Sequence, residues 1–303
     1  MGWHGPWQVS VVAGGALVLA AAGGAPVSAA PPGNDAGPDT TAPTAAVPTP
    51  GSGGREIAVM LPGNIPLVLV RIPAGTFTMG SPAGERGRSD DETPHQVTLT
   101  RDYFIGKYEV TQAQWQAIMG NNPSYFSSGG DYPVDQVSWD DITGSDGFLA
   151  RLNRHLASTK QPGAGQMRLP TEAEWERAAR GGTTTRFSYG DVLECRDLCK
   201  PCATHSRYMW WCGEGPRPVG GKQPNPYGLY DVHGNVFEWV QDWYGLYGSS
   251  AQTDPKGPAR GSDRVVRGGG SDTLLQYSRS AARTLRLPGE RHPHTGLRLA
   301  RSL

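Results

Sequence analysis

Residues 168–182 read RLPTEAEWERAARGG, and this stretch carries the clearest local structural signal in the chain. Thr171 is followed three residues later by Glu174, which is the spacing of a capping box at the start of a helix. The two glycines that follow Arg180 readily take the left-handed backbone conformation that ends many helices. We therefore expect a helix over residues 171–180.

Short strands and helices are expected on both sides of this helix. Runs rich in β-branched residues and bounded by turn residues indicate strands, and apolar residues at helical spacing indicate helices. The expected strands are residues 66–72, 76–79, 96–100, 265–267 and 296–300, and the further expected helices are residues 111–118 and 148–156. This mixture predicts an α+β domain with much irregular structure.

The composition agrees with a fold that is rich in loops. Glycine (42 residues) and proline (26 residues) make up about 22% of the chain, compared with about 12% in average proteins. Such a content excludes a helical bundle, because these residues favour turns over regular structure. Lys+Arg and Asp+Glu are both 28, so the chain lacks the basic excess of a nucleic-acid-binding protein, and we expect no nucleic-acid partner.

The first 54 residues differ from the rest of the chain. Residues 9–22 are an apolar run of signal-peptide length, and residues 27–29 (Val-Ser-Ala) fit a cleavage site, so residues 1–30 are expected to be a signal peptide. Residues 31–54 are rich in Pro, Ala and Thr and are expected to be a disordered linker. Residues 55–303 then form the folded domain. We expect a protein exported to the periplasm or the extracellular space, with no membrane span after signal removal.

Eight segments of this folded part are distinctive as a set. They are residues 71–81 (RIPAGTFTMGS), 91–99 (DETPHQVTL), 108–115 (YEVTQAQW), 133–141 (PVDQVSWDD), 168–182, 225–243 (NPYGLYDVHGNVFEWVQDW), 264–269 (RVVRGG) and 296–300 (GLRLA). In this order and spacing they resemble the formylglycine-generating enzyme family, also called the sulfatase-modifying-factor domain. The resemblance covers nearly all of residues 65–301 and implies a single domain with a C-type-lectin-like fold.

The resemblance also implies a chemistry that this sequence does not support. Oxidases of the family convert a cysteine in a Cys-x-Pro-x-Arg segment of sulfatases to formylglycine, using oxygen and a copper ion held by two thiolates. Soft sulfur ligands are the ones that hold Cu(I). The family carries the pair shortly after the RVVRGG segment, but residues 268–303 contain no cysteine. Copper is therefore not expected, and we assign no catalytic residue.

The four cysteines of the chain form one cluster: Cys195, Cys199, Cys202 and Cys212. In an exported protein an even number of cysteines indicates two disulfides, here within an insertion before residue 225, and three pairings are open. A zinc site of four thiolates and a relocated copper centre are the alternatives.

The segment DVHGNVFE suits a calcium ion. Asp231 and Glu238 are hard oxygen donors, which calcium prefers in flexible geometry. The resemblance implies structural calcium bound by these two side chains and by the backbone carbonyls of Gly234 and Val236. The alternative is a turn whose carboxylates only accept hydrogen bonds from local amides.

Two other groups of polar residues have both a chemical and a structural interpretation. His292 and His294 are one residue apart, so they form half of a metal site or are solvated loop residues. Glu172 and Glu176 share a helical face, and salt links with Arg168 and Arg180 on the helix surface explain them without acid–base chemistry.

Three classes of function therefore follow from the sequence. The first is a binding or accessory module that takes a protein or peptide ligand and has no oxidase activity. The second is an oxidase that modifies a protein or peptide and uses an unrecognised metal site. The third is a purely structural or interaction protein that its flexible tether displays at a surface. We favour the first, because the scaffold segments are present and the thiolate pair is absent.

Overall fold

The computed structural model describes residues 55–161, 163–193, 199–200 and 202–303. These residues form three β-sheets, each of which is antiparallel or mixed. The expected signal peptide (1–30), the expected linker (31–54) and Cys195 lie outside the described residues. The largest sheet is antiparallel and has the order β1-β2-β5-β12-β6. Its strands are β1 (Glu56–Leu61), β2 (Ile65–Ile72), β5 (Tyr103–Gly106), β12 (Ala300–Ser302) and β6 (Met167–Arg168).

The other two sheets are smaller. The four-stranded sheet has the order β10-β9-β7-β11, and in it β11 runs parallel to β7. Its strands are β7 (Phe237–Trp243), β9 (Arg264–Arg267), β10 (Thr284–Arg286) and β11 (Thr295–Leu297). The three-stranded sheet consists of β3 (Gly75–Met79), β4 (His95–Leu99) and β8 (Gln252–Thr253).

Three of the six helices in the described part of the chain begin at a capping box. The six are α1 (Gln112–Met119), α2 (Trp139–Thr143), α3 (Phe148–Thr159), α4 (Glu172–Arg180), α5 (Ala203–Tyr208) and the 3₁₀ helix η1 (Leu275–Ser278). Thr111, Ser138 and Thr171 each close a capping box at the start of α1, α2 and α4. The helix expected at residues 171–180 is confirmed, and Gly181 ends it with φ 61°.

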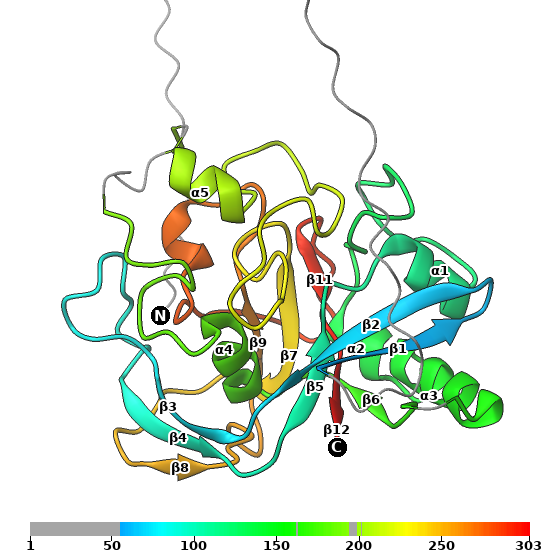
Figure 1. Ribbon diagram of the computed structural model, residues 1–303, viewed down its shortest axis with the longest axis horizontal. Helices are drawn as coiled ribbons and strands as arrows, with labels where there is room; N and C mark the ends of the chain where they lie inside the picture. The colour runs from blue at the N-terminus through cyan, green and yellow to red at the C-terminus, as the bar shows by residue number, and fades with distance from the viewer. Residues whose placement is uncertain (1–54, 162, 194–198, 201) are drawn as a thin grey trace, which may run out of the picture. The chain divides into compact units, whose positions relative to one another are not determined.

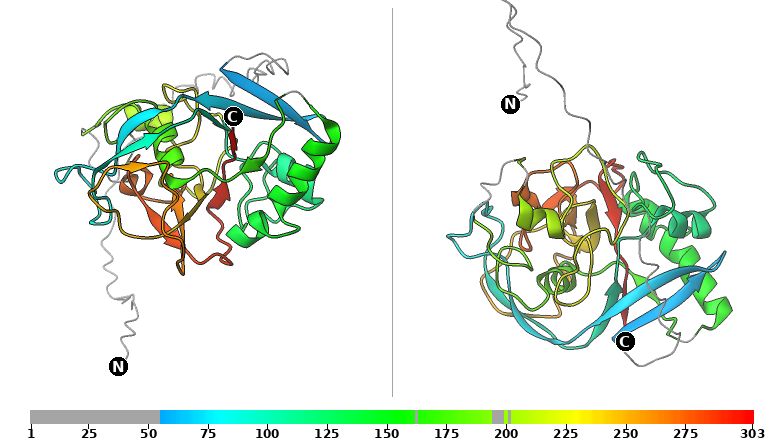
Figure 2. Two further views of the ribbon diagram at one scale, coloured as in Figure 1. Left: turned by 90° about the horizontal axis from the view of Figure 1, so that it is seen from below. Right: turned by 45° about the horizontal axis from the view of Figure 1, so that its top comes forward.

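The helices separate into two groups, each with its own apolar core. Figure 1 shows α1, α2 and α3 beside the β1–β2 hairpin, and α4 next to β7 and β9. The same grouping is visible from the two other directions in Figure 2. In the first core, the rings of Trp115 and Phe148 stack with their centres 4.8 Å apart. In the second, α4 contributes Ala173 and Trp175, each 1% exposed.

The strand expected at residues 296–300 is wrong as a single element. The chain forms β11 in one sheet, leaves it after Leu297, and enters β12 in the other sheet at Ala300. Between them lies Arg298, which is fully buried and ion-paired with Glu238. The break exists because this arginine must face the core at the point where the two sheets meet. In the part of the chain that is described, no helix is long and apolar enough to cross a bilayer.

Candidate functional site

The turn before β7 is the first candidate site, and its backbone is unusual. Asp231 and Asn235 have left-handed φ values of 58° and 65°, and Gly234 has φ 88°. A Cβ on Gly234 would lie 2.0 Å from the carbonyl oxygen of Trp210, so only glycine fits there. The turn therefore holds its acidic side chains in fixed directions just before β7 begins.

Glu238 is already committed to neighbours from other elements. Both of its carboxylate oxygens lie 3.0 Å from Arg298 Nε, and Arg298 Nη2 donates at 2.7 Å. The indole N–H of Trp175, on α4, donates at 2.6 Å. Glu238 thus ties β7 to α4 and to the end of β11, whatever ion is bound nearby.

Asp231 differs from Glu238, because one of its carboxylate oxygens has no hydrogen-bond partner among the described residues. Asp231 Oδ2 accepts a hydrogen bond from the Gly220 amide at 2.7 Å, whereas Oδ1 is buried and has no hydrogen-bond partner among the described residues. Burial raises the pKa of this carboxyl to about 6, and the charge of Glu238 adds to the effect. A buried, unpartnered carboxylate oxygen is the kind of donor that a cation would use.

Glu109 is a third buried carboxylate at this turn, and the sequence did not reveal it. Its side chain accepts hydrogen bonds from the Val236 amide at 3.1 Å and from the Asn235 side-chain amide at 2.6 Å. Burial, and then the charges of Asp231 and Glu238, raise its pKa well above the usual range. No feature of the YEVT segment indicates that these partners lie more than 120 residues away.

Three acidic side chains meet one arginine at this turn. Three carboxylates, those of Glu109, Asp231 and Glu238, face the guanidinium of Arg298. Within the described ranges no three His, Cys, Asp or Glu side chains surround a common metal position. An ion here would therefore depend on backbone carbonyls beside Asp231, as the sequence-based calcium assignment also requires.

All three described cysteines of the cluster are disulfide-bonded. Cys199 and Cys212 are bonded, with their Cα atoms 5.3 Å apart. Cys202 is buried, and no cysteine within the described residues is free. A zinc or copper site at Cys199 and Cys212 would need thiolates that a disulfide does not offer. Cys195 belongs to the residues that the structure does not describe.

The disulfide lies against the segment where the resemblance places the copper-binding cysteines. The Cys212 amide donates to the Thr273 carbonyl at 3.2 Å, and the Gly213 amide donates to the Ser271 carbonyl at 2.6 Å. The Asn235 amide also donates to the Trp210 carbonyl at 3.0 Å. The cysteine insertion, the acidic turn and the segment after Gly269 therefore form one continuous region.

A serine, a histidine and an aspartate meet in this region. His294 Nδ1 lies 3.2 Å from the Ser271 hydroxyl, and His294 Nε2 lies 3.4 Å from Asp272 Oδ2. Burial lowers the pKa of His294. The set has the composition of a hydrolytic triad, but Ser271 is only 1% exposed, so its hydroxyl cannot reach a substrate. The contacts with Ser271 and Asp272 fix the orientation of the His294 ring.

His292 and His294 do not point at a common metal position. Their ring centres are 5.9 Å apart, and His292 Nδ1 accepts a hydrogen bond from the His294 amide at 3.2 Å. The nitrogens of His294 already face Ser271 and Asp272. The structure thus gives these histidines partners within the protein.

Aromatic side chains lie next to His294, which is itself only 9% exposed. Phe126 lies with its ring centre 5.0 Å from that of His294, and Tyr125 next to it is 67% exposed. In the segment that follows Asp272, Leu274 and Tyr277 are 41% and 44% exposed. We call these exposed and half-buried residues, together with the buried Ser271 and His294, the 271–294 face: Tyr125, Phe126, Ser271, Asp272, Leu274, Tyr277 and His294. It combines large apolar side chains with one histidine and one carboxylate.

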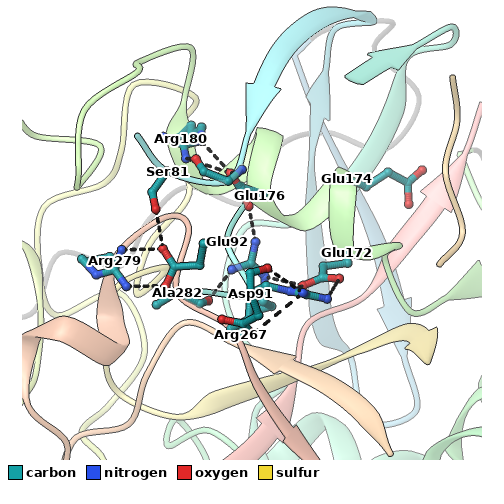
Figure 3. Close-up of polar contacts among 12 residues, drawn as sticks. Ser81, Asp91, Glu92, Glu172, Glu174, Glu176, Arg180, Arg267, Arg279 and Ala282 are labelled. Atoms are coloured by element: carbon teal, nitrogen blue, oxygen red, sulfur yellow. Dashed lines mark hydrogen bonds and ion pairs between the residues drawn. The ribbon is translucent and has the colours of Figure 1, made fainter. Parts of the chain in front are cut away.

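Glu172 and Glu176 of α4 belong to the interior and not to the helix surface. Figure 3 shows Glu176 between Arg180 and Arg267, and Glu92 between Ser81 and Arg279. Glu172 pairs with Arg283 at 2.7 Å.

The pairing expected on the helix surface is therefore only partly correct. Glu176 does pair with Arg180, but both are buried, and Arg168 pairs with Glu174 instead. The partners Arg267 and Arg283 come from distant segments, which local spacing cannot identify. These ion pairs hold α4 against the sheets and leave no carboxylate of this group free for acid–base chemistry.

Comparison with known proteins agrees with this fold. Residues 67–303 match the model of the sulfatase-modifying factor enzyme 1-like domain. The mouse formylglycine-generating enzyme is 30% identical, with 78% of this chain and 77% of the mouse protein covered. The serine/threonine-protein kinase pkn1 of Chlamydia pneumoniae is 32% identical over 78% of this chain, which corresponds to 38% of the kinase. Among solved structures, Treponema denticola variable protein 1 has a TM-score of 0.71 and 31% identity, covering 82% of this chain and all of that one.

The fold and these neighbours define a C-type-lectin-like α+β domain. The chain belongs to the sulfatase-modifying factor enzyme 1-like family, in which the formylglycine-generating enzymes are found.

Proposed function

We propose that this chain is an exported binding or accessory module that has the scaffold of its family without the copper oxidase chemistry. One observation carries the proposal: no cysteine follows Cys212, and Cys212 itself is bonded to Cys199 beside the segment where the thiolate pair is expected. A copper centre of the family type needs two free thiolates. Without this centre, the domain would serve to bind another molecule.

The ligand that we propose is a protein or peptide bound at the 271–294 face. Tyr125 and Tyr277 are exposed there, and tyrosine is enriched in protein–protein interfaces because it offers large contact area with a polar tip. Relatives of this chain carry names as different as an oxidase, a kinase and a variable protein, which favours a fold that is not bound to one chemistry.

A structural calcium ion at the acidic turn and export from the cytoplasm complete the proposal. The unpartnered oxygen of Asp231 and the carbonyls of Gly234 and Val236 would hold the ion, and Glu238, which is already paired with Arg298 and Trp175, would contribute its charge from nearby. Its two positive charges would offset the excess of buried carboxylates and fix the turn. The disulfide supports export, because such bonds persist in oxidising compartments.

The absence of oxidase activity is tested directly. The purified full-length protein is incubated with Cu(I), a thiol reductant, oxygen and a Cys-x-Pro-x-Arg peptide, and intact-mass spectrometry follows the peptide. We expect no aldehyde above the no-enzyme control, with the Streptomyces coelicolor formylglycine-generating enzyme as the positive control. Conversion of the peptide by this chain would refute the proposal and favour the alternative oxidase with an unrecognised metal site.

Peptide binding is tested at the 271–294 face. A displayed peptide library is selected on the immobilised protein, and the affinity of an enriched peptide is measured by fluorescence polarisation. We expect the double variant Y125S/Y277S to lose at least about tenfold in affinity. The matched control is L303S, which removes another exposed apolar side chain (62% exposed) and should have no effect. No enrichment, or an equal effect of both variants, would contradict this binding site.

A further inference from the structure

A second site lies away from the 271–294 face, in a cavity of about 350 Å³. The cavity is lined by the start of α4, the end of β7 and the loop of residues 254–258, and it shares no lining residue with the 271–294 face. Its volume is in the range of small-molecule sites. We infer that this cavity binds a small organic carboxylate with an apolar body.

A buried carboxyl group with one free oxygen lines the cavity. Asp242 is only 3% exposed, and its Oδ2 accepts a hydrogen bond from the Glu172 amide at 2.9 Å. No hydrogen bond to its Oδ1 is found in the described part of the chain. Gly257 lies directly beside it, and a Cβ there would lie 3.0 Å from Oδ1. A glycine at this position keeps the space next to the free oxygen open.

The carboxyl of Asp242 carries a proton at neutral pH. Burial, and then the charge of Glu172, raise its pKa to about 8, although the Glu172 amide and Arg283 act in the opposite direction. A protonated carboxyl whose one oxygen already accepts a hydrogen bond can donate from the other. A carboxylate is the strongest partner for such an O–H donor, because the hydrogen bond is then charge-assisted.

The remaining charges of the cavity also favour an anion. Glu172 and Arg283 line it as well, but they form a two-fold ion pair at 2.7 and 2.9 Å and cancel each other. Lys256 is exposed at the cavity and has no ion pair within the described residues. With Asp242 neutral, Lys256 is a charged lining side chain without an ion pair among the described residues, although its charge also acts on Asp254, and it would attract a carboxylate.

The walls are suited to an apolar body. Met79 and Ala173 are buried on one side, and the ring of Tyr247 lies on the other, with the Arg283 guanidinium 3.8 Å from its centre. Leu246 is 81% exposed although it lines the cavity. An exposed leucine beside a cavity offers contact to a ligand that enters it.

The charged and titratable groups around Asp242 come from each element packed against it. They are Glu172 and Glu174 on α4, Arg264 on β9, Arg283 before β10, His95 on β4, Lys256 in the 254–258 loop, and Tyr247 after β7. Burial raises the pKa of Tyr247 well above its usual range, so it keeps its proton near pH 8. Ionisation of Asp242 would place a negative charge against the ligand.

The experiment measures the affinity of two carboxylate probes, 4-fluorophenylacetate and hexanoate, for the full-length protein by NMR titration at pH 6.5 and pH 9.0. With a pKa of about 8, roughly a tenth of Asp242 is protonated at pH 9.0, so Kd should rise about tenfold between the two pH values. D242N keeps a donor at this position and cannot ionise, so its Kd should be the same at both pH values. The neutral 4-fluorophenylacetamide should bind more weakly than the acid at pH 6.5.

Two charge variants distinguish binding in this cavity from non-specific electrostatic attraction of the acids to the protein. K256Q should weaken binding of both acids at pH 6.5 by at least threefold. R260Q removes an exposed positive charge close by in the sequence that does not line the cavity, and it should change nothing. Absence of binding of both acids, a pH effect that survives in D242N, or equal losses in K256Q and R260Q would each overturn the inference. None of these outcomes depends on the oxidase or peptide experiments.

Discussion

Replacing Arg267 by methionine tests whether buried ion pairs hold α4 in place. Arg267 is completely buried, and its guanidinium pairs with Glu176 and lies 3.3 Å from Glu172. It also donates a hydrogen bond to the Ala282 carbonyl. Methionine fills a similar volume but leaves these three acceptors without that donor.

The expected loss of stability follows from the ion pairs that remain in the R267M variant. Glu176 would keep Arg180 and Glu172 would keep Arg283, so each carboxylate retains one partner, but the buried cluster loses one positive charge. Removing one member of a buried ion pair costs about 3–5 kcal/mol. For a domain of this size that corresponds to a fall in Tm of about 6–20 °C.

The matched control is Arg168→Met, which removes an arginine that also pairs with α4. Arg168 bonds Glu174 at 2.6 Å, but its side chain is 27% exposed, so its loss should cost about 1 kcal/mol or less. Both variants are compared with the parent protein by urea denaturation, with tryptophan fluorescence and circular dichroism as probes. If R267M is destabilised no more than R168M, burial does not set the strength of these pairs and the reasoning is wrong.

Three further predictions concern protonation, calcium and the disulfide. Because the folded state raises the pKa of Asp242 to about 8, folding takes up a proton above pH 4, and stability should fall by up to about 1.4 kcal/mol per pH unit until pH 8. Asp242→Asn should remove this pH dependence of stability, which is measured from the urea midpoints of both proteins at pH 5 and pH 9. An equal pH dependence in the two proteins would contradict the raised pKa of Asp242. Chelation by EGTA should lower Tm by about 5 °C or more, and added calcium should restore it. Asp231→Asn should reduce that response, whereas an unchanged Tm on chelation would argue against calcium. Cys212→Ser opens a loop closed over 13 residues and should cost about 2–3 kcal/mol in non-reducing urea denaturation; an unchanged midpoint would show that the disulfide adds no stability.

The sequence predicts those parts of the fold that are determined locally. The boundaries of α4 follow from Thr171, Glu174 and Gly181, all of which act within a few residues of the helix. The split of residues 296–300 into two strands was not predictable in this way. It depends on Arg298 reaching Glu238, sixty residues earlier in the chain, at the place where two sheets meet.

The candidate sites show the same limit. Asp231 and Glu238 were identifiable from their chemistry and from the resemblance, but Glu109 became visible only through its contacts with Val236 and Asn235. Asp242 lies within the segment that identifies the family, yet nothing local shows that its carboxyl lines a cavity. Its elevated pKa comes from burial and from Glu172, which the chain brings together from 70 residues away.

The distribution of buried charge explains how the segment after Gly269 can lack the thiolate pair without loss of the fold. Its second half is anchored, because Arg279 bonds Glu92 and Arg283 bonds Glu172 in the interior. Its first half holds Leu274 and Tyr277, which are both more than 40% exposed. Side chains at the exposed positions contribute little to the core, so they can be exchanged at a cost near that of other surface substitutions. The residues that stabilise the fold are thus different from those that determine the chemistry of the site. Replacing the exposed residues therefore leaves the fold intact.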